Sequence, residues 1–161
     1  MLGRRIRAMW RSIRPYQWLG NLVVFAPLVF SAHLFEPGRL SRVAVGFLLL
    51  CGLSIASYLV NDVVDRVSHR RHPVSRHRPL AAGDFSVRGA LATAAALGIV
   101  SLAGAYLLEP TFGLAATTYL VLVLLYSLVL RRLPVLDVGA IAAGLVVRAV
   151  GGAVLADVKI S

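Results

Sequence analysis

Charged residues are scarce in this sequence, at 15% of 161 positions, whereas soluble domains carry about 25%. Acidic residues are the rarest of them, with seven Asp and Glu against 17 Lys and Arg. The single cysteine excludes an internal disulfide, and the 14 glycines follow no fixed period, which excludes a collagen-like chain. Hydrophobic residues make up 58% of the chain, and its mean hydropathy is +0.80. This composition also excludes intrinsic disorder and predicts a chain embedded in lipid.

Five apolar segments approach or exceed the length needed to cross a bilayer, which is about 20 residues. They are too long and too evenly apolar to be half-buried strands. The predicted membrane helices are Trp18–Phe35, Val43–Val60, Gly89–Leu108, Thr111–Leu130 and Val135–Ala156. Pro27 predicts a kink in the first helix, which we interpret as an uncleaved anchor because four more spans follow. The predicted fold class is all-α, a polytopic bundle forming a single transmembrane domain over residues 1–161.

Positive charge is concentrated on one predicted side of the membrane. Five arginines precede the first span, six follow the second and two follow the fourth, whereas the other side carries Arg39, Arg42 and Lys159. The positive-inside rule therefore predicts a plasma-membrane protein whose N-terminus and loop 61–85 are cytoplasmic. Because this distribution accounts for most of the net charge of +10, we expect a lipid bilayer and not a nucleic acid as partner.

The second span ends in a cluster of oxygen-bearing side chains. Asn61 and Asp65 are four residues apart and Asp62 and Asp65 are three apart, so a continuing helix would place all three on one face. Acids at the C-terminal end of a helix are disfavoured by its dipole, so a compensating charge is expected. Mg²⁺ suits this set, because it prefers oxygen ligands and binds through one or two carboxylates plus substrate phosphate. A helix end neutralised by neighbouring arginines is the alternative that the residues leave open.

Arg148 lies inside the fifth span. A charged side chain there is costly, so Arg148 is expected to face a polar cavity or to extend to the outer interface. Asp137 precedes it by three helical turns on nearly the same face. Together with Tyr126 and Ser127, these residues predict a polar stripe facing the interior of the bundle, with Tyr126 and Arg148 as substrate-binding candidates.

The motifs resemble those of the UbiA-type membrane prenyltransferases, and most closely the decaprenyl-phosphate phosphoribosyltransferase branch. The resemblance begins at Ile13 and covers nearly the whole chain after it. It is carried by the Asn61-Asp62-x-x-Asp65 motif and by four further stretches. Those stretches are residues 13–21, residues 25–28, the His72-Pro73-x-x-Arg76-x-Arg78-Pro79 loop with its continuation to Gly83, and residues 147–152.

The resemblance implies an all-helical bundle of about nine spans around a central cavity. It implies Mg²⁺ held by Asn61, Asp62 and Asp65, with both aspartates catalytic. Phosphate contacts are expected from Arg76 and Arg78, with Arg14 and Gln17 near the same mouth. The donor would be phosphoribosyl diphosphate and the acceptor decaprenyl phosphate, in the synthesis of cell-wall arabinan.

The chain departs from the family pattern in ways that leave alternatives open. His69 stands where a third aspartate is usual, and Gly20 and Ser75 stand where the branch often has lysine. Five spans correspond to about half of such a bundle, so we expect a longer product or a second chain that supplies the other half. An aromatic prenyltransferase using a prenyl diphosphate, and an inactive membrane protein, are the competing interpretations.

Overall fold

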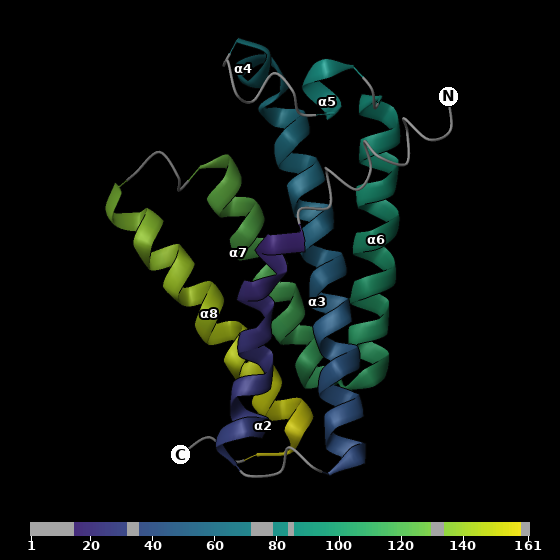
Figure 1. Cartoon of the computed structure of the whole chain (residues 1–161), viewed down its shortest axis with the longest axis vertical. Coiled ribbons are helices and arrows are strands. Elements are labelled where there is room, and N and C mark those ends of the chain that lie inside the picture. The colour runs from purple at the N-terminus through teal and green to yellow at the C-terminus, as the bar shows by residue number, and fades with distance from the viewer. Residues whose placement is uncertain (1–14, 32–35, 72–78, 84–85, 130–133, 159–161) are drawn as a thin grey trace.

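The computed structural model describes residues 15–31, 36–71, 79–83, 86–129 and 134–158, and every regular element in these ranges is helical (Figure 1). In chain order the elements are η1 (Pro15–Phe25), α2 (Ala26–Phe30), α3 (Pro37–Val64), α4 (Arg66–Arg71), α5 (Pro79–Ala82), α6 (Val87–Leu108), α7 (Pro110–Leu128) and α8 (Pro134–Ala156). The prediction of an all-α transmembrane bundle is confirmed.

Four helices, α3, α6, α7 and α8, are long and apolar enough to cross a membrane. Their starts follow elementary capping rules. Pro37, Pro110 and Pro134 each open a helix, where a missing N–H costs nothing because the first turn leaves it unpaired. The N-cap of α6 is Ser86, whose hydroxyl oxygen accepts the backbone N–H of Gly89 at 3.0 Å. Four of the five predicted spans therefore correspond to membrane-length helices.

The first predicted span differs from the expectation of one long kinked helix. Residues 15–25 form the 3₁₀ helix η1, and only Ala26–Phe30 are α-helical. The change occurs at Pro27, which occupies the first turn of α2 and has no N–H to continue an earlier helix. Because a 3₁₀ helix rises about 2 Å per residue, η1 covers more length than an α-helix of the same residue count. Within the described residues this segment is the shorter apolar helix Trp18–Phe30, and residues 32–35 of the predicted span lie outside the described part of the chain.

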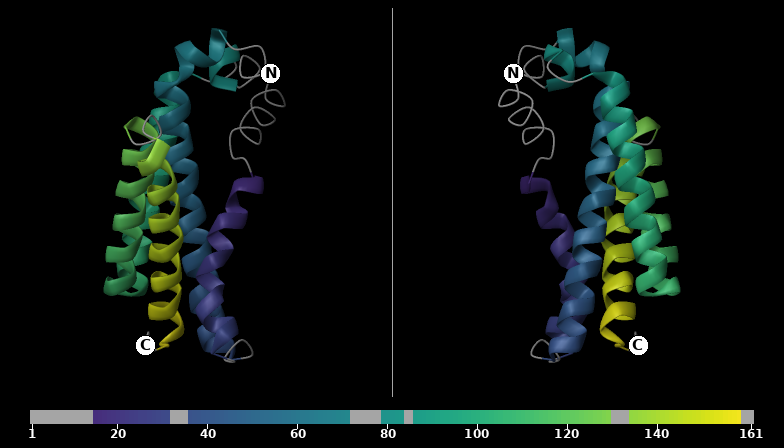
Figure 2. Two further views of the ribbon diagram at one scale, coloured as in Figure 1. Left: turned by 90° about the vertical axis from the view of Figure 1, so that its left-hand side faces the viewer. Right: turned by 90° about the vertical axis from the view of Figure 1, so that its right-hand side faces the viewer.

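The long helix α3 is the centre of the bundle and packs against η1, α6, α7 and α8. Its 28 residues extend about 42 Å, which exceeds the roughly 30 Å hydrocarbon core of a bilayer. Its two ends are therefore expected at the membrane interfaces. Figures 1 and 2 show α4 and α5 beyond the C-terminal end of α3, beside the start of α6, with the end of α8 at the opposite end of the bundle.

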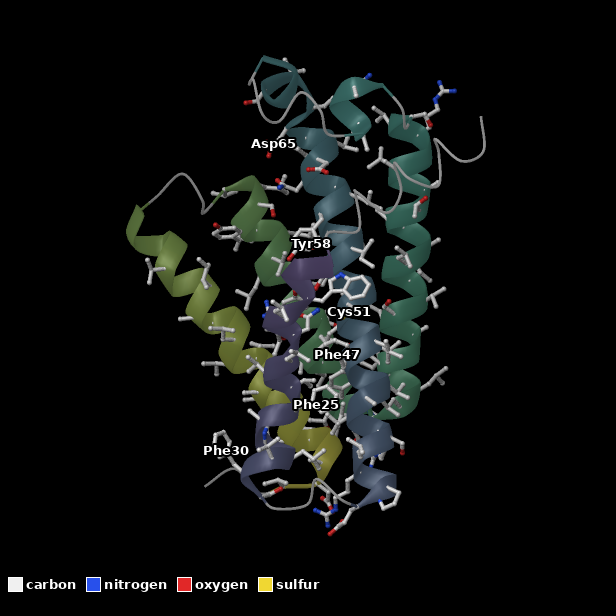
Figure 3. The ribbon with its side chains drawn as sticks, viewed as in Figure 1. Phe25, Phe30, Phe47, Cys51, Tyr58 and Asp65 are labelled. Carbon is white, nitrogen blue, oxygen red and sulfur yellow. The ribbon has the colours of Figure 1, made fainter. Side chains whose placement is uncertain are left out.

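Two groups of buried side chains hold the helices together. The larger group joins η1, α2, α3, α6, α7 and α8, with Phe112 and Tyr119 as its largest members. Figure 3 shows Phe25 and Phe47 beside this core, and their ring centroids are 5.7 Å apart. The smaller group joins α3, α5 and α6 around Leu59 and Leu80. The core thus fixes α3, α7 and α8 relative to one another, and these helices carry most of the candidate site.

Candidate functional site

The last turns of α3 carry the three residues of the predicted metal site. Asn61 is half-buried, Asp62 is 2% exposed, and Asp65 is the C-cap of the helix, with its backbone N–H bonded to the Asn61 carbonyl at 2.9 Å. Figure 3 shows Tyr58 and Asp65 in succession along α3 toward its C-terminal end. Two carboxylates and an amide oxygen thus lie within two helical turns. Among the described residues no group of three or more His, Cys, Asp or Glu is placed to hold a metal, so the metal hypothesis depends on Asn61 as well as on the two aspartates.

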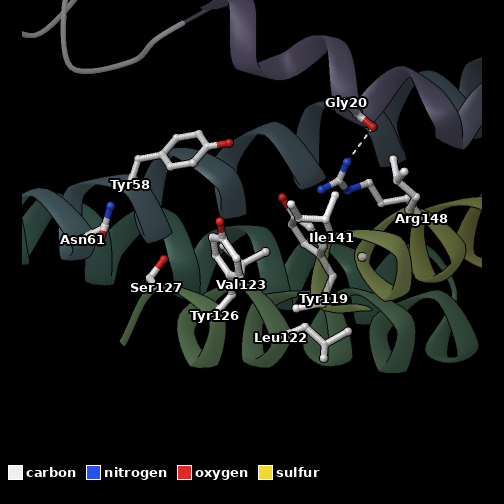
Figure 4. A pocket seen from close by; sticks show the side chains of 13 residues that line it. Gly20, Tyr58, Asn61, Tyr119, Leu122, Val123, Tyr126, Ser127, Ile141 and Arg148 are labelled. Atoms are coloured by element: carbon white, nitrogen blue, oxygen red, sulfur yellow. Dashed lines mark hydrogen bonds between the residues drawn. The ribbon is translucent and has the colours of Figure 1, made fainter. Parts of the chain in front are cut away.

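A cavity of about 500 Å³ lies between η1, α3, α7 and α8 (Figure 4). Its walls combine apolar side chains with a small number of polar groups, as is typical of ligand sites. The polar or backbone contributors are Gly20, Tyr58, Asn61, Tyr119, Tyr126, Ser127 and Arg148. Neither Asp62 nor Asp65 is among the lining residues, so Asn61 is the member of the α3 cluster that reaches the cavity wall.

Arg148 contributes the cavity's one described cationic side chain. Its Nη1 donates to the Gly20 carbonyl oxygen at 2.7 Å, and its Cζ lies 4.6 Å from the centroid of the Tyr119 ring. An arginine at membrane depth costs about 2.5–3.5 kcal/mol on insertion scales, so these contacts are needed to hold it there. The Nε atom is buried and has no hydrogen-bond partner among the described residues.

Tyr119 is held by a buried hydrogen-bond network that connects η1, α3 and α7. The Tyr119 and Ser54 hydroxyl oxygens are 2.8 Å apart, and Asn21 Nδ2 donates to Ser54 Oγ at 3.0 Å. The one hydroxyl proton of Ser54 is donated to the Leu50 carbonyl at 2.9 Å, so Tyr119 must be the donor to Ser54. Asn21, Ser54 and Tyr119 are each no more than 2% exposed. The ring beneath Arg148 is therefore fixed in place by polar contacts as well as by packing.

The Tyr119→Phe variant is expected to lose about 1 kcal/mol of folding stability, because Ser54 loses a buried donor while the ring under Arg148 remains. Thermal unfolding in lipid nanodiscs measures the change. Tyr106→Phe is the matched control, since the Tyr106 hydroxyl also bonds one side-chain hydroxyl, that of Thr117 at 3.0 Å, at an exposed position. Equal stability of the two variants would contradict the role of the buried network.

The structure brings together some of the predicted site residues and leaves others undescribed. Asn61, Tyr126 and Arg148 line one cavity, and Ser127 joins them. The side chains of Gln17 and Asp137 lie outside the described part of the chain, as do residues Arg14, Arg76 and Arg78 entirely. Arg66, which follows the acidic motif, donates its Nε to the Leu80 carbonyl at 3.3 Å and so joins α4 to α5.

Among the polar or backbone contributors to the cavity, sequence reasoning missed three: Gly20, Tyr58 and Tyr119. Tyr58 precedes Asn61 by one helical turn, and Tyr119 precedes Tyr126 by two turns on the same face of α7. This spacing was an available signal for both tyrosines. Gly20 contributes through its backbone carbonyl, so its side chain gave no signal.

Comparison with known proteins identifies the family of this chain. The sequence profile of the UbiA prenyltransferase family matches residues 21–161. The chain is 36% identical over 155 residues to decaprenyl-phosphate phosphoribosyltransferase of Mycobacterium tuberculosis H37Rv, covering 94% of this chain and 51% of that protein. The corresponding protein of Corynebacterium glutamicum is 36% identical over 157 residues, which is 95% of this chain and 47% of that protein.

More distant relatives extend the comparison. The Nodulation protein NoeC of Azorhizobium caulinodans is 29% identical, covering 92% of this chain and 48% of that protein. The solved structure of a UbiA homologue from Archaeoglobus fulgidus, bound to GPP and Mg²⁺, matches with a TM-score of 0.80 at 25% identity. That match covers 96% of this chain and 56% of the solved one. The chain therefore spans about half the length of the curated relatives it matches.

Proposed function

This chain belongs to the UbiA prenyltransferase family, and we propose that it acts as an integral membrane transferase of the phosphoribosyl branch. The donor is phosphoribosyl diphosphate, and the acceptor is decaprenyl phosphate or another polyprenyl phosphate of cell-wall arabinan synthesis. One observation carries this proposal, namely a cavity with Asn61 in its wall on α3 and the cation Arg148 in its wall on α8. Polar groups of this kind suit substrates that both carry phosphate, whereas an aromatic acceptor carries none.

The α3 cluster fits a hard divalent cation by its donor chemistry. Asp62 and Asp65 offer carboxylates and Asn61 an amide oxygen, all close to the end of a membrane helix. These three residues would hold Mg²⁺, which when bound would neutralise charge on the diphosphate leaving group. His69, in place of a third aspartate, is not needed in this assignment.

The chain's own residues position the reacting groups. In the transfer, the bond between the sugar C1 and the diphosphate oxygen breaks, and its electron pair leaves with the diphosphate. An oxygen of the lipid phosphate forms the new bond to C1. Asn61 and Tyr126 line the cavity where these groups meet, and Arg14, Gln17, Arg76 and Arg78 are proposed to contact phosphate at its mouth. Holding both reactants in one pocket supplies much of the rate enhancement in such a step.

The distribution of arginines supports a cytoplasmic location for the C-terminal end of α3 and the loop 61–85 in the plasma membrane. A water-soluble donor then reaches the site from the cytoplasm, and the lipid acceptor reaches it from the bilayer. Because the chain spans about half of its curated relatives, we propose that further segments of the same product, or a second chain, complete the walls.

An aromatic prenyltransferase is the second candidate, and it is favoured by the GPP bound to the solved homologue. The presence of Arg148 in the cavity argues against it, because an apolar prenyl tail beside Arg148 would leave its buried Nε without a hydrogen-bond partner.

Transfer assays in the native membranes that contain the chain separate the two candidates. With Mg²⁺ present, we expect label from phosphoribosyl diphosphate to appear in an added polyprenyl phosphate. Label from a prenyl diphosphate appearing in an aromatic acceptor would instead support the second candidate. Transfer of neither label would contradict both.

A further inference from the structure

We infer that Arg148 forms a second anion subsite in the cavity, one that binds a phosphate monoester and is separate from the diphosphate site at the end of α3. This inference rests on the proposed function and deepens it by dividing the substrates' phosphate groups between two places. The shared chemistry is a monoester dianion, which the lipid acceptor carries on its prenyl chain and the donor carries on its sugar.

The two subsites are separated along α3. Asn61 and Ser54 are seven residues apart, which is about 10 Å of helical rise. Ser54 Oγ lies 2.8 Å from the Tyr119 hydroxyl, and the Tyr119 ring lies under the Arg148 guanidinium. A Mg²⁺–oxygen bond is only about 2 Å long, so a diphosphate bridged to Asp62 and Asp65 stays near the end of α3. The guanidinium of Arg148 is therefore available for a different group.

The guanidinium is also oriented for a second ligand. Its Nη1 is used by the Gly20 carbonyl, at 2.7 Å, which leaves the Nε–Nη2 edge. Nε is buried and has no partner among the described residues, and buried donors of this kind are nearly always satisfied. This side-on edge of arginine matches two oxygens of a phosphate. Beside Nη2 lies Gly144, which leaves space in the cavity wall because it has no side chain.

The charge of Arg148 points to an anion and not to an apolar chain. Its contacts in the described part of the protein are a carbonyl oxygen and an aromatic face, and both are neutral. An anionic phosphate would pair with the guanidinium inside the membrane, where an unpaired charge is costly. The Gly20 carbonyl and the Tyr119 ring then act as positioning groups that fix the direction of the side chain.

The experiment compares four probes on the full chain in lipid nanodiscs with Mg²⁺, using equilibrium binding of radiolabelled ligand. Geranyl diphosphate and geranyl phosphate share one tail and differ in having a diphosphate or a monoester. Phosphoribosyl diphosphate has both groups, and inorganic diphosphate has no monoester. Arg148→Gln is the test variant. Arg42→Gln is the matched control, because Arg42 pairs with Glu109 at 3.2 Å, away from this cavity.

We expect Arg148→Gln to weaken binding of a monoester-bearing probe at least tenfold, and to change both geranyl diphosphate and inorganic diphosphate less than twofold. Weaker binding of geranyl phosphate identifies the lipid acceptor as the source of the monoester. Weaker binding of phosphoribosyl diphosphate alone identifies the donor sugar as the source. Arg42→Gln is expected to leave the binding of all four probes unchanged. Gly20→Ala is a second test variant, and it keeps the arginine. Its added Cβ would lie 2.9 Å from Arg148 Nη1 and would therefore displace the guanidinium. It is expected to weaken the same probe selectively, and it decides the matter if Arg148→Gln does not fold.

Two results would overturn the inference alone. In the first, Arg148→Gln weakens the binding of geranyl diphosphate as much as that of the monoester probes, which would place Arg148 in the diphosphate site. In the second, a folded variant binds every probe as the wild type does, which would make Arg148 purely structural. If the wild-type chain binds no diphosphate in the presence of Mg²⁺, the proposed function fails as well.

Discussion

The Asp62→Asn variant is expected to transfer at a rate at least about 100-fold lower than the wild type in native membranes supplied with Mg²⁺, and Asp65→Asn should behave alike. Asparagine keeps the size of the side chain and removes its charge, so the loss reports on electrostatics and not on packing. Asp62 is 2% exposed near the end of a 28-residue helix, where the helix dipole disfavours an acid. Product formation from labelled phosphoribosyl diphosphate measures the effect.

The matched control for this pair is Asp157→Asn, at the opposite end of the bundle. Asp157 is exposed and has a φ of +52°, a conformation that asparagine adopts readily. Its activity should equal that of the wild type. Wild-type rates in both Asp62→Asn and Asp65→Asn would show that the metal–diphosphate site has been assigned to the wrong residues.

The Gly152→Ala variant is expected to destabilise the bundle by about 1–3 kcal/mol, as overpacked cores do. A Cβ at this position would overlap the backbone carbonyl of Val24 in η1, which cannot move aside as a side-chain end can. Helices in membranes use glycine for such close approaches. The next contact along the same interface, one turn away, is the hydrogen bond between Arg148 and the Gly20 carbonyl. Separation of η1 from α8 therefore also loosens Arg148 in the cavity.

The control for Gly152 is Gly139, which lies in the same helix, where an added Cβ would meet no described atom within 4 Å. Gly139→Ala should leave stability unchanged or raise it by up to about 1 kcal/mol, since alanine is the better helix former. Thermal unfolding in nanodiscs compares the two. Unfolding of both variants at the same temperature would contradict the close contact between η1 and α8.

The sequence was sufficient to predict α3, α6, α7 and α8, because long apolar segments bounded by proline or polar residues admit few other structures. It did not predict that Pro15–Phe25 is a 3₁₀ helix. A segment that is hydrophobic on all sides shows no periodicity in its sequence, so the sequence cannot distinguish a 3₁₀ helix from an α-helix there. The close contact between Gly152 and Val24 joins residues far apart in the sequence and was likewise invisible.

The candidate site was predictable where charge or polarity interrupts an apolar segment. Asn61, Tyr126 and Arg148 were chosen on that basis and line one cavity. Tyr119 was not chosen, although its spacing of two turns from Tyr126 places both on one face of α7, and its position under the Arg148 guanidinium is visible only in the structure. The metal and substrate roles of all these residues stay predictions. The same holds for Arg14, Arg76 and Arg78, which lie outside the described residues, and for Gln17, whose side chain does.

The central claim is that the end of α3 binds a diphosphate together with Mg²⁺. Titration of the wild-type chain in nanodiscs with radiolabelled phosphoribosyl diphosphate, with Mg²⁺ and then with the metal chelated, tests it most directly. We predict saturable binding at one site per chain that is lost on chelation and is competed by inorganic diphosphate. Binding that chelation leaves unchanged, or no saturable binding at all, would contradict the claim.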